Sequence, residues 1–206
     1  MRKKNLAILI FDDVEVLDFA GPFEVFSAAN ERNDYQLLNV YTTALTKNPI
    51  HAKNGLKVVA DYTLDNCPKM DYLIVPGGSG TRALLKNDSF LSWFTRAASG
   101  CDHLLSICSG ALILAATGLL NGLSATTHHQ VFDELIELAP KTQIVRNRRF
   151  MDNGKILTSA GVAAGIDMSL YMVAKLYGEK TAATTAQYIE YDYSPDQITA
   201  RHKGSV

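Results

Sequence analysis

The sequence predicts an α/β fold in which an open, mostly parallel sheet carries helices on both faces. Two largely apolar runs, Leu6–Phe11 and Asp71–Val75, have the composition of strands that are covered on both sides. Segments with apolar residues at helical spacing alternate with such runs along the whole chain. A length of 206 residues, 47% of them apolar and 20% charged, suits one globular domain of this class.

The first half of the chain begins with the strand Leu6–Phe11 and a helix over Asp18–Asn30, with Pro22 placed in the first helical turn. A second strand is expected at Tyr35–Thr43. The segment Thr46–Asp61 contains an Asn-Gly dipeptide and β-forming residues, which predicts a small hairpin. The strand Asp71–Val75 then runs into a proline- and glycine-rich turn through which no regular element can continue.

The second half repeats the alternation of strand and helix. Another Asn-Gly dipeptide predicts a hairpin turn near the end of the sheet. The expected helices are Thr81–Lys86, Ser89–Ser99, Ser109–Ala116, Val131–Leu138, Ala163–Tyr177 and Lys180–Tyr191. The expected strands are Leu104–Ile107, Leu123–Thr126, Phe150–Asp152 and Ile156–Ser159.

No repeat, linker or change of composition divides the chain. We therefore expect a single domain over residues 1–193 and a polar, frayed tail over 194–206. The basic N-terminus followed by Leu6–Phe11 superficially resembles a signal peptide, but the apolar run is short and ends at two aspartates. The three cysteines show no disulfide or metal-type spacing, so a reducing cytoplasm is the expected location.

The charge balance gives no reason to expect nucleic-acid or membrane binding, because the net charge is −1 and no apolar stretch approaches the length of a bilayer span. The dense basic cluster at Arg146, Arg148 and Arg149 is interpreted as a solvated face. A metal site is not expected, since His128 and His129 are adjacent and lack the spacing of metal ligands.

Cys108 is the principal candidate for chemistry. It lies between the predicted strand Leu104–Ile107 and the predicted helix Ser109–Ala116, with small residues, Ser106 and Gly110, two positions to either side. A nucleophile on such a strand-to-helix turn has the arrangement of a nucleophile elbow. The N–H groups at the helix start would favour the thiolate over the thiol. Alternatively, Cys108 is a small buried hydrophobic residue.

Three segments are expected to meet at the carboxyl edge of the sheet, where sites in such folds lie. They are Asp12–Asp18, the turn Gly77–Gly80, and Cys108. The glycine-rich turn could present N–H groups to a negative charge beside the nucleophile, or it is only a tight turn. Asp18 could cap its helix or exchange a proton with Cys108. The spacing alone does not say which of the acidic residues near this strand–helix junction would lie beside the cysteine.

Two further residues have open interpretations. His128 follows a predicted strand end and could serve as a base for Cys108, although a structural or solvated histidine is commoner in such a loop. Asp167 falls at the start of a predicted helix, where we expect it to cap the helix or to complement its dipole.

Four motifs in this order resemble the DJ-1/PfpI superfamily, within the class I glutamine amidotransferase-like fold. They are Pro76-Gly-Gly after a strand, Ile107-Cys-Ser-Gly110, Thr126-Thr-His128 and Leu157-Thr-Ser159. The resemblance covers the chain from Leu6 to about Tyr191 and implies a flavodoxin-like sandwich. Finer motifs resemble the branch that contains isocyanide hydratases and the N-terminal domains of some AraC-type regulators: Val14–Pro22, Pro76–Gly80, Gly118–Gly122 and Gly161–Asp167. The chain ends before a DNA-binding helix-turn-helix would fit, so we expect a stand-alone enzyme.

The resemblance implies roles for individual residues. Cys108 matches the superfamily's nucleophile, and Asp18 matches the acid of the hydratases, whereas the glutamate of DJ-1 itself would fall nearer Glu15. Backbone N–H groups around Gly78 and Ser109 would form the oxyanion site, with Gly77 as an accessory residue. His128 matches a histidine near the DJ-1 cysteine.

Ser109 distinguishes this chain from two groups of relatives. It stands where the hydratases usually carry threonine, and both residues have a hydroxyl. It also stands where PfpI-type proteases carry histidine, which argues against peptidase activity.

The function that the resemblance implies is hydration of an isocyanide to an N-substituted formamide through a thioimidate on Cys108, without a cofactor. The alternatives are a redox or small-molecule sensor of the DJ-1 type and a glyoxalase- or deglycase-like enzyme, in which Glu15 or His128 would act as base. The resemblance also implies a homodimer with a small-molecule substrate.

Overall fold

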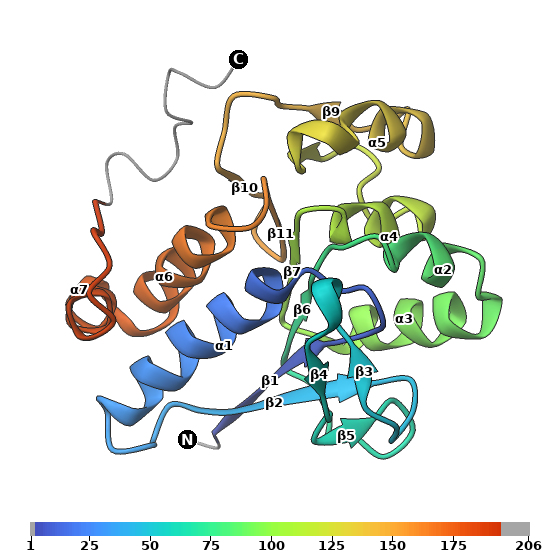
Figure 1. The fold of residues 1–206 in the computed structure, drawn as a ribbon. Coiled ribbons are helices and arrows are strands. Elements are labelled where there is room, and N and C mark those ends of the chain that lie inside the picture. The colour runs from blue at the N-terminus through green and yellow to red at the C-terminus, as the bar shows by residue number, and fades with distance from the viewer. Residues whose placement is uncertain (1–2, 195–206) are drawn as a thin grey trace.

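The computed structural model describes residues 3–194 and has the predicted architecture, with a seven-stranded sheet between two layers of helices (Figure 1). The order of the strands is β10-β11-β7-β6-β1-β2-β5. All neighbours are parallel except β10 and β11, which form an antiparallel pair at one end. The predicted tail over residues 194–206 lies almost wholly outside the described residues.

Six of the seven strands of the sheet agree closely with the sequence prediction, and β5 was not predicted. Their bounds are β1 Lys4–Leu9, β2 Leu38–Ala44, β5 Tyr62–Thr63, β6 Tyr72–Val75, β7 His103–Ile107, β10 Phe150–Asp152 and β11 Ile156–Ser159. The four residues of β6 are all buried, as a parallel strand between two helical layers requires. The hairpin at Asn153-Gly154 is confirmed, since Gly154 has a φ of 83° and joins β10 to β11.

Helices α1 (Val16–Glu31), α6 (Ala164–Tyr177) and α7 (Glu179–Tyr188) lie on one face of the sheet (Figure 1). Helices α2 (Thr81–Leu85), α3 (Asp88–Gly100), α4 (Gly110–Ala116) and α5 (Phe132–Leu138) lie on the other. None of the helices described is long and apolar enough to cross a membrane.

Outside the main sheet, β3 (Ile50–His51) and β4 (Lys57–Val58) form the predicted hairpin, with the 3₁₀ turn η1 (Lys53–Gly55) at its tip. A second small pair, β8 (Ser124–Ala125) and β9 (Gln143–Ile144), precedes and follows the turn η2 (His129–Val131) and α5.

The start of α1 differs from the expectation. The helix begins at Val16, so Glu15 takes the cap position and Pro22 lies in the second turn rather than the first. Glu15 makes no side-chain capping bond. Asp18 therefore lies inside the first turn, fully buried, and the expectation that it caps the helix is wrong.

Close backbone contact fixes α4 against β6. A Cβ atom on Gly110 would lie 2.1 Å from the carbonyl oxygen of Val75, which a backbone atom cannot relieve by a rotamer change. The first turn of α4 therefore rests directly on the end of β6, and this contact sets the position of Cys108 two residues earlier.

We predict that Gly110→Ala destabilises the fold by about 1–3 kcal/mol or more, because the added methyl group overpacks against backbone. Gly100→Ala is the matched control, since a Cβ there meets nothing within 4 Å at the end of α3. That control should be neutral or stabilising by up to about 1 kcal/mol. Urea unfolding of both variants tests the contact, and equal stabilities would contradict it.

Candidate active site

Cys108 occupies a strained turn between β7 and α4, as the sequence predicts. Its φ is +54°, in the left-handed region that residues other than glycine rarely adopt. Its N–H donates to the carbonyl of Ser159 at 3.2 Å, and its own carbonyl accepts from the Thr127 hydroxyl at 2.7 Å. The side chain is buried, with 9% of the residue exposed. Neighbouring elements thus hold the strained backbone from both sides.

Two glycines enclose the Cys108 side chain. A Cβ on Gly77 would lie 2.7 Å from the Cβ of Cys108, and one on Gly161 would lie 2.8 Å from the same atom and 3.2 Å from Sγ. Both positions therefore exclude any side chain. The glycine-rich turn after β6 was expected beside the nucleophile. No role was predicted for Gly161 from the sequence, although it begins the motif Gly161–Asp167 on which the resemblance to the hydratase branch rests.

Asp18 bridges two segments beside Cys108. Its Oδ2 accepts from the N–H of Gly77 at 3.0 Å, and its Oδ1 accepts from the N–H of Val162 at 2.9 Å. The carboxyl group is also within hydrogen-bonding reach of the Cys108 thiol. Between the two acids that the sequence left open, the structure therefore brings Asp18 to the cysteine.

Glu15 is engaged elsewhere. Its Oε2 accepts from Lys53 Nζ at 3.0 Å, and the pair joins α1 to the tip of the β3–β4 hairpin. Its backbone N–H donates to the carbonyl of Gly77 at 2.9 Å. Glu15 thus helps to fix the turn beside Cys108, and its charge acts on Asp18 from a distance.

Burial determines the protonation of the pair. It raises the pKa of Asp18 to about 6, against the opposing effect of the two backbone N–H groups. It also raises the pKa of the Cys108 thiol to about 12, and the negative charge of Asp18 adds to this rise. At neutral pH the pair therefore holds one proton, on sulfur. Burial thus acts against the thiolate that the N–H groups at the start of α4 were expected to favour, while the N–H of Ser109 lowers the pKa of the thiol.

The residues expected to form an oxyanion site lie together, but one N–H is already engaged. The N–H of Gly78 donates to the Ser109 hydroxyl at 2.9 Å, and that hydroxyl donates to the Gly78 carbonyl at 3.1 Å. Thr81 also donates to this carbonyl, at 2.8 Å. The backbone N–H of Ser109 faces the Cys108 sulfur. The backbone N–H of Ser109 is therefore a better candidate than that of Gly78 to donate to a negative charge that forms on a substrate bound at the sulfur.

His128 lies at the turn after β8, where it precedes η2. Its Nδ1 accepts from the N–H of Gln130 at 3.4 Å, and its ring lies 4.2 Å, centroid to centroid, from that of His129. The side chain is half-buried. Its neighbour Thr127 is the residue that reaches the backbone of Cys108. An accessory role for His128 stays a prediction.

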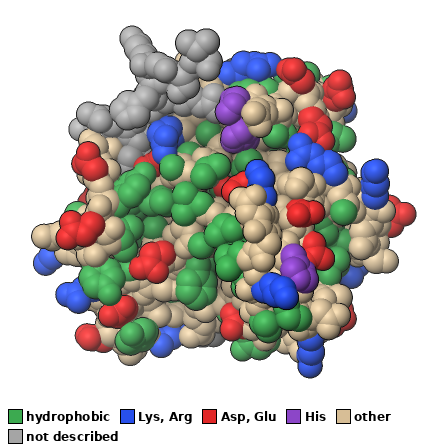
Figure 2. All heavy atoms as spheres, in the orientation of Figure 1, with side chains coloured by type: hydrophobic (Ala, Val, Ile, Leu, Met, Phe, Trp, Pro, Cys, Tyr) green, Lys and Arg blue, Asp and Glu red, His purple; other side chains and the backbone are tan. Residues whose placement is uncertain are grey.

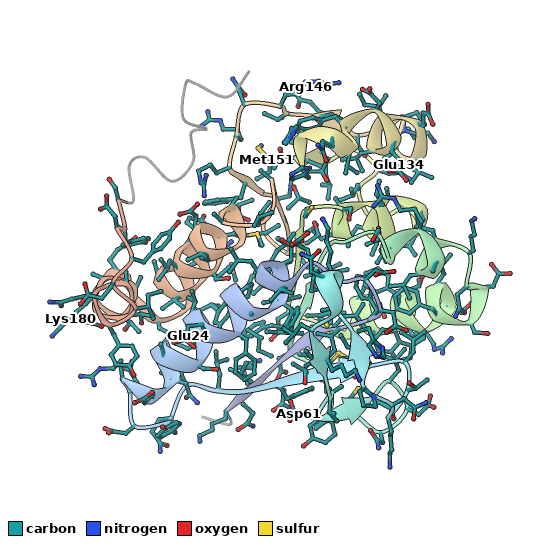
Figure 3. The ribbon with its side chains drawn as sticks, in the orientation of Figure 1. Glu24, Asp61, Glu134, Arg146, Met151 and Lys180 are labelled. Atoms are coloured by element: carbon teal, nitrogen blue, oxygen red, sulfur yellow. The ribbon has the colours of Figure 1, made fainter. Side chains whose placement is uncertain are left out.

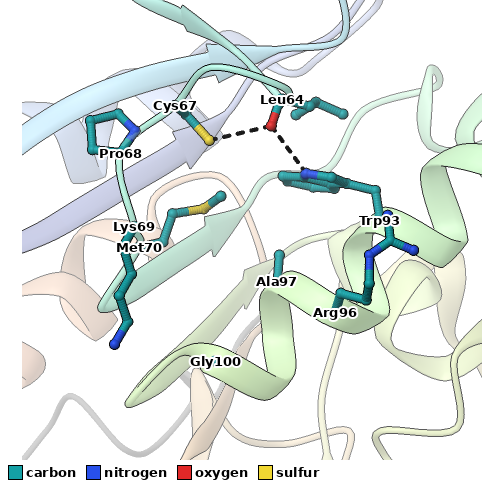
Figure 4. Close-up of a pocket in the computed structure, with 9 residues that line it drawn as sticks. All are labelled: Leu64, Cys67, Pro68, Lys69, Met70, Trp93, Arg96, Ala97 and Gly100. Atoms are coloured by element: carbon teal, nitrogen blue, oxygen red, sulfur yellow. Dashed lines mark hydrogen bonds between the residues drawn. The ribbon is translucent and has the colours of Figure 1, made fainter.

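A hollow of about 330 Å³ lies at the opposite edge of the sheet, where β6 and β7 begin (Figure 4). The half-buried Cys67 lies there, with its thiol 3.6 Å from the carbonyl of Leu64, which also accepts from the Trp93 indole. Burial raises the pKa of this thiol as well. The charged residues that line this hollow are Lys69 and Arg96 (Figure 4), whereas Cys108 has the carboxyl group of Asp18 beside it.

A protein-family model described as the DJ-1/PfpI family matches residues 4–175. The chain belongs to the DJ-1/PfpI family. It is 31% identical over 194 residues to an isonitrile hydratase of Pseudomonas putida, covering 93% of this chain and 80% of that protein. It also resembles the crystal structure of a ThiJ/PfpI family protein from Pseudomonas syringae, with a TM-score of 0.84, 31% identity, and coverage of 95% of this chain and 78% of the other.

Regulators are also among the relatives of this DJ-1/PfpI member. The transcriptional regulator GbdR of Pseudomonas aeruginosa is 25% identical over 92% of this chain. The match spans about half of the regulator's length, 51%. The family therefore fixes the fold, while its members differ in what they do.

The raised pKa of Asp18 predicts how stability depends on pH. Because the folded protein binds this proton more tightly than the unfolded chain, the favourable contribution is complete below pH 4 and is lost as pH rises through about 6. We expect the stability of wild type relative to Asp18→Asn to rise by about 2 kcal/mol between pH 7 and pH 4. Urea unfolding at several pH values measures it. Glu24→Gln, an exposed site on the same helix, is the control, and a pH-independent difference for Asp18→Asn would contradict the assignment.

The Ser109 hydroxyl predicts a second effect on stability. In Ser109→Ala the buried N–H of Gly78 loses its acceptor, which should cost about 1–3 kcal/mol. Ser99→Ala, on the exposed face of α3, removes only a bond to its own helix and should change little. Chemical unfolding of the two variants compares them, and a neutral Ser109→Ala would show that water or another acceptor replaces the hydroxyl.

Proposed function

We propose that this protein hydrates isocyanides to N-substituted formamides, with Cys108 as nucleophile and Asp18 as acid and base. The observation that carries the proposal is the buried Asp18 carboxylate, which is held by two backbone N–H groups within reach of a thiol and shares one proton with it. The similarity to the isonitrile hydratase of Pseudomonas putida over most of both chains supports the same reaction class.

The first step forms a carbon–sulfur bond. The Cys108 sulfur attacks the terminal carbon of R–N≡C while its proton passes to the Asp18 carboxylate. Asp18 then gives that proton to the same carbon, which yields a thioimidate, Cys–S–CH=N–R. A positioned carboxylate is a suitable carrier for this proton, and such general acid–base catalysis contributes typically about 10²–10⁴-fold.

The second step uses one water molecule. Water adds to the thioimidate carbon, its oxygen bonds to carbon and its proton passes through Asp18 to the nitrogen. Collapse of the tetrahedral adduct breaks the carbon–sulfur bond, releases R–NH–CHO and returns the proton to sulfur. The cycle uses covalent catalysis alone and needs no cofactor.

The sensor alternative is less well supported. Oxidation of cysteine proceeds from the thiolate, and burial together with the charge of Asp18 raises the pKa of the Cys108 thiol. The deglycase alternative needs a base beside Cys108 other than Asp18. Glu15 is bound to Lys53, which leaves His128 as the candidate for that role.

We also propose that the protein is a homodimer that acts on a small molecule. Leu17 and Phe23 are large apolar side chains on α1, each 37% exposed. Figure 2 shows a broad group of hydrophobic side chains on the face where α1 and α6 lie. Burial of this surface between two copies would remove it from water.

The proposed reaction predicts formamide production from an aromatic isocyanide, measured by chromatography. Cys108→Ala should abolish turnover, because the thiol that forms the thioimidate is removed. Asp18→Asn should lower kcat by about 10²–10⁴-fold, because the proton carrier is lost. Cys67→Ala, which removes a half-buried thiol at the opposite edge of the sheet, is the matched control and should leave turnover unchanged.

Three results would redirect the proposal. Absence of formamide with the wild-type protein would remove the hydratase function. Undiminished turnover by Cys108→Ala would remove the covalent mechanism. Addition of oxygen to Cys108 by peroxide without any turnover would favour the sensor, and conversion of a 2-oxoaldehyde would favour the deglycase.

A further inference from the structure

The segment from Ala160 to Asp167 holds one side of the Cys108 site in a strained conformation. Val162 has a φ of +50°, which a β-branched residue adopts only under constraint. This conformation directs its N–H to Asp18 Oδ1, while the preceding Gly161 packs against the Cys108 side chain. Strain of this kind costs about 1–3 kcal/mol and persists only where surrounding contacts enforce it.

Arg149 contacts this segment at both of its ends. Its backbone carbonyl accepts from the N–H of Ala160 at 2.7 Å. Its guanidinium forms a two-bond ion pair with Asp167, through Nε and Nη2 to Oδ2. The Arg149 and Asp167 side chains are only 25% and 7% exposed, so the pair is shielded from solvent. Two N–H donors of one guanidinium that converge on the same carboxylate oxygen restrict orientation as well as distance.

Asp167 is itself fixed in the first turn of α6. Its Oδ1 accepts from the hydroxyl of Tyr191 at 2.8 Å, while Oδ2 binds Arg149. The expectation that Asp167 caps α6 is therefore incomplete, because its carboxylate binds side chains from two other segments. The expectation that Arg149 belongs to a solvated face is wrong for the same reason.

We propose that Arg149 is a positioning residue for the Cys108–Asp18 pair. It touches neither residue. Its backbone carbonyl holds Ala160, and its guanidinium clamps Asp167, so that the N–H of Val162 continues to donate to the Asp18 carboxylate. Loss of the clamp lets Val162 relax to negative φ, turns its N–H away and leaves Asp18 with one backbone donor. The other charged groups that act on Asp18, Glu15 and Lys53, lie on different elements and keep their places.

Arg146 provides a matched control within the same stretch of chain. It lies on the surface at the α5 side of the molecule (Figure 3), where it binds the exposed Asp133 at 3.3 Å and covers the ring of Phe132. It carries the same charge, and these contacts are with α5 rather than with residues 160–167. Arg146→Gln therefore removes the charge of an arginine without removing the clamp.

The test measures the rate at which iodoacetamide alkylates Cys108, followed on the Cys108 peptide by mass spectrometry across pH 4–9. This readout concerns the same site as the proposed function but needs no turnover. In Arg149→Gln, loss of one N–H bond to the carboxylate should move the inflection that reports Asp18 upward by about one pH unit. Arg146→Gln should leave the profile unchanged.

Further variants separate positioning from general damage to the fold. Asp167→Asn should give the same shift, and Arg149→Gln with Asp167→Asn should add little, because both remove one interaction. Arg149→Lys should shift the inflection less than Arg149→Gln does, since a lysine keeps the charge but cannot form both bonds to Asp167. Tyr191→Phe, which keeps the ion pair, should give a smaller shift in the same direction and serves if Arg149→Gln does not fold.

Amide hydrogen exchange gives the direct structural readout. Arg149→Gln should speed exchange in the peptide that contains Val162 and leave β6 and β7 protected. A pH profile of Arg149→Gln that coincides with that of Arg146→Gln would overturn the proposal. Shifted alkylation in a protein that hydrates no isocyanide would instead uphold the positioning role and remove the proposed function.

Discussion

The burial of the Asp18 carboxylate is the constraint on which the rest of the site depends. A buried carboxylate needs partners, and Asp18 finds them in backbone N–H groups from two separate connections, at Gly77 and Val162. The first follows β6 and the second follows β11, on either side of the strand that ends at Cys108. One side chain on α1 thereby fixes the mutual placement of three strand ends.

The unusual backbone conformations follow from this arrangement. Cys108 and Val162 both have positive φ, and the glycines at 77 and 161 allow the backbone to close on the cysteine. Each of these features would be unfavourable alone. They are stabilised by the parallel sheet and by ties such as that of Thr127 to the Cys108 carbonyl. The site is therefore built by rigid elements that meet, rather than by any one segment.

The fold could be predicted from the sequence because its main strands are continuous apolar runs bounded by turn residues. Errors arose where a local signal was ambiguous. Asp18, followed three residues later by Gly-Pro, looked like the start of a helix. The helix α1 instead begins two residues earlier, at Val16. The strands β5 and β9, each of two residues, have no periodicity to detect.

The candidate site was only partly accessible from sequence. The elbow around Cys108 has a local signature, but the choice of Asp18 over Glu15 came from a family resemblance, since spacing along α1 does not say which carboxylate turns inward. The ion pair of Arg149 with Asp167 and the strain at Val162 were not predictable. Both are consequences of contacts between segments far apart in the chain, and valine by itself favours extended backbone.

The single proton shared by Cys108 and Asp18 bears on which electrophiles suit the site. When a thiol adds to a carbonyl, the new charge develops on an oxygen beside the attacked carbon, and a separate donor must meet it. When a thiol adds to an isocyanide, sulfur and hydrogen both end on the same carbon. A carboxylate beside the sulfur can accept the proton and return it to that carbon without a second acid. The N–H of Gly78 is bound to the Ser109 hydroxyl, so a carbonyl oxygen would find fewer free donors here. This asymmetry favours isocyanide chemistry over carbonyl chemistry at Cys108.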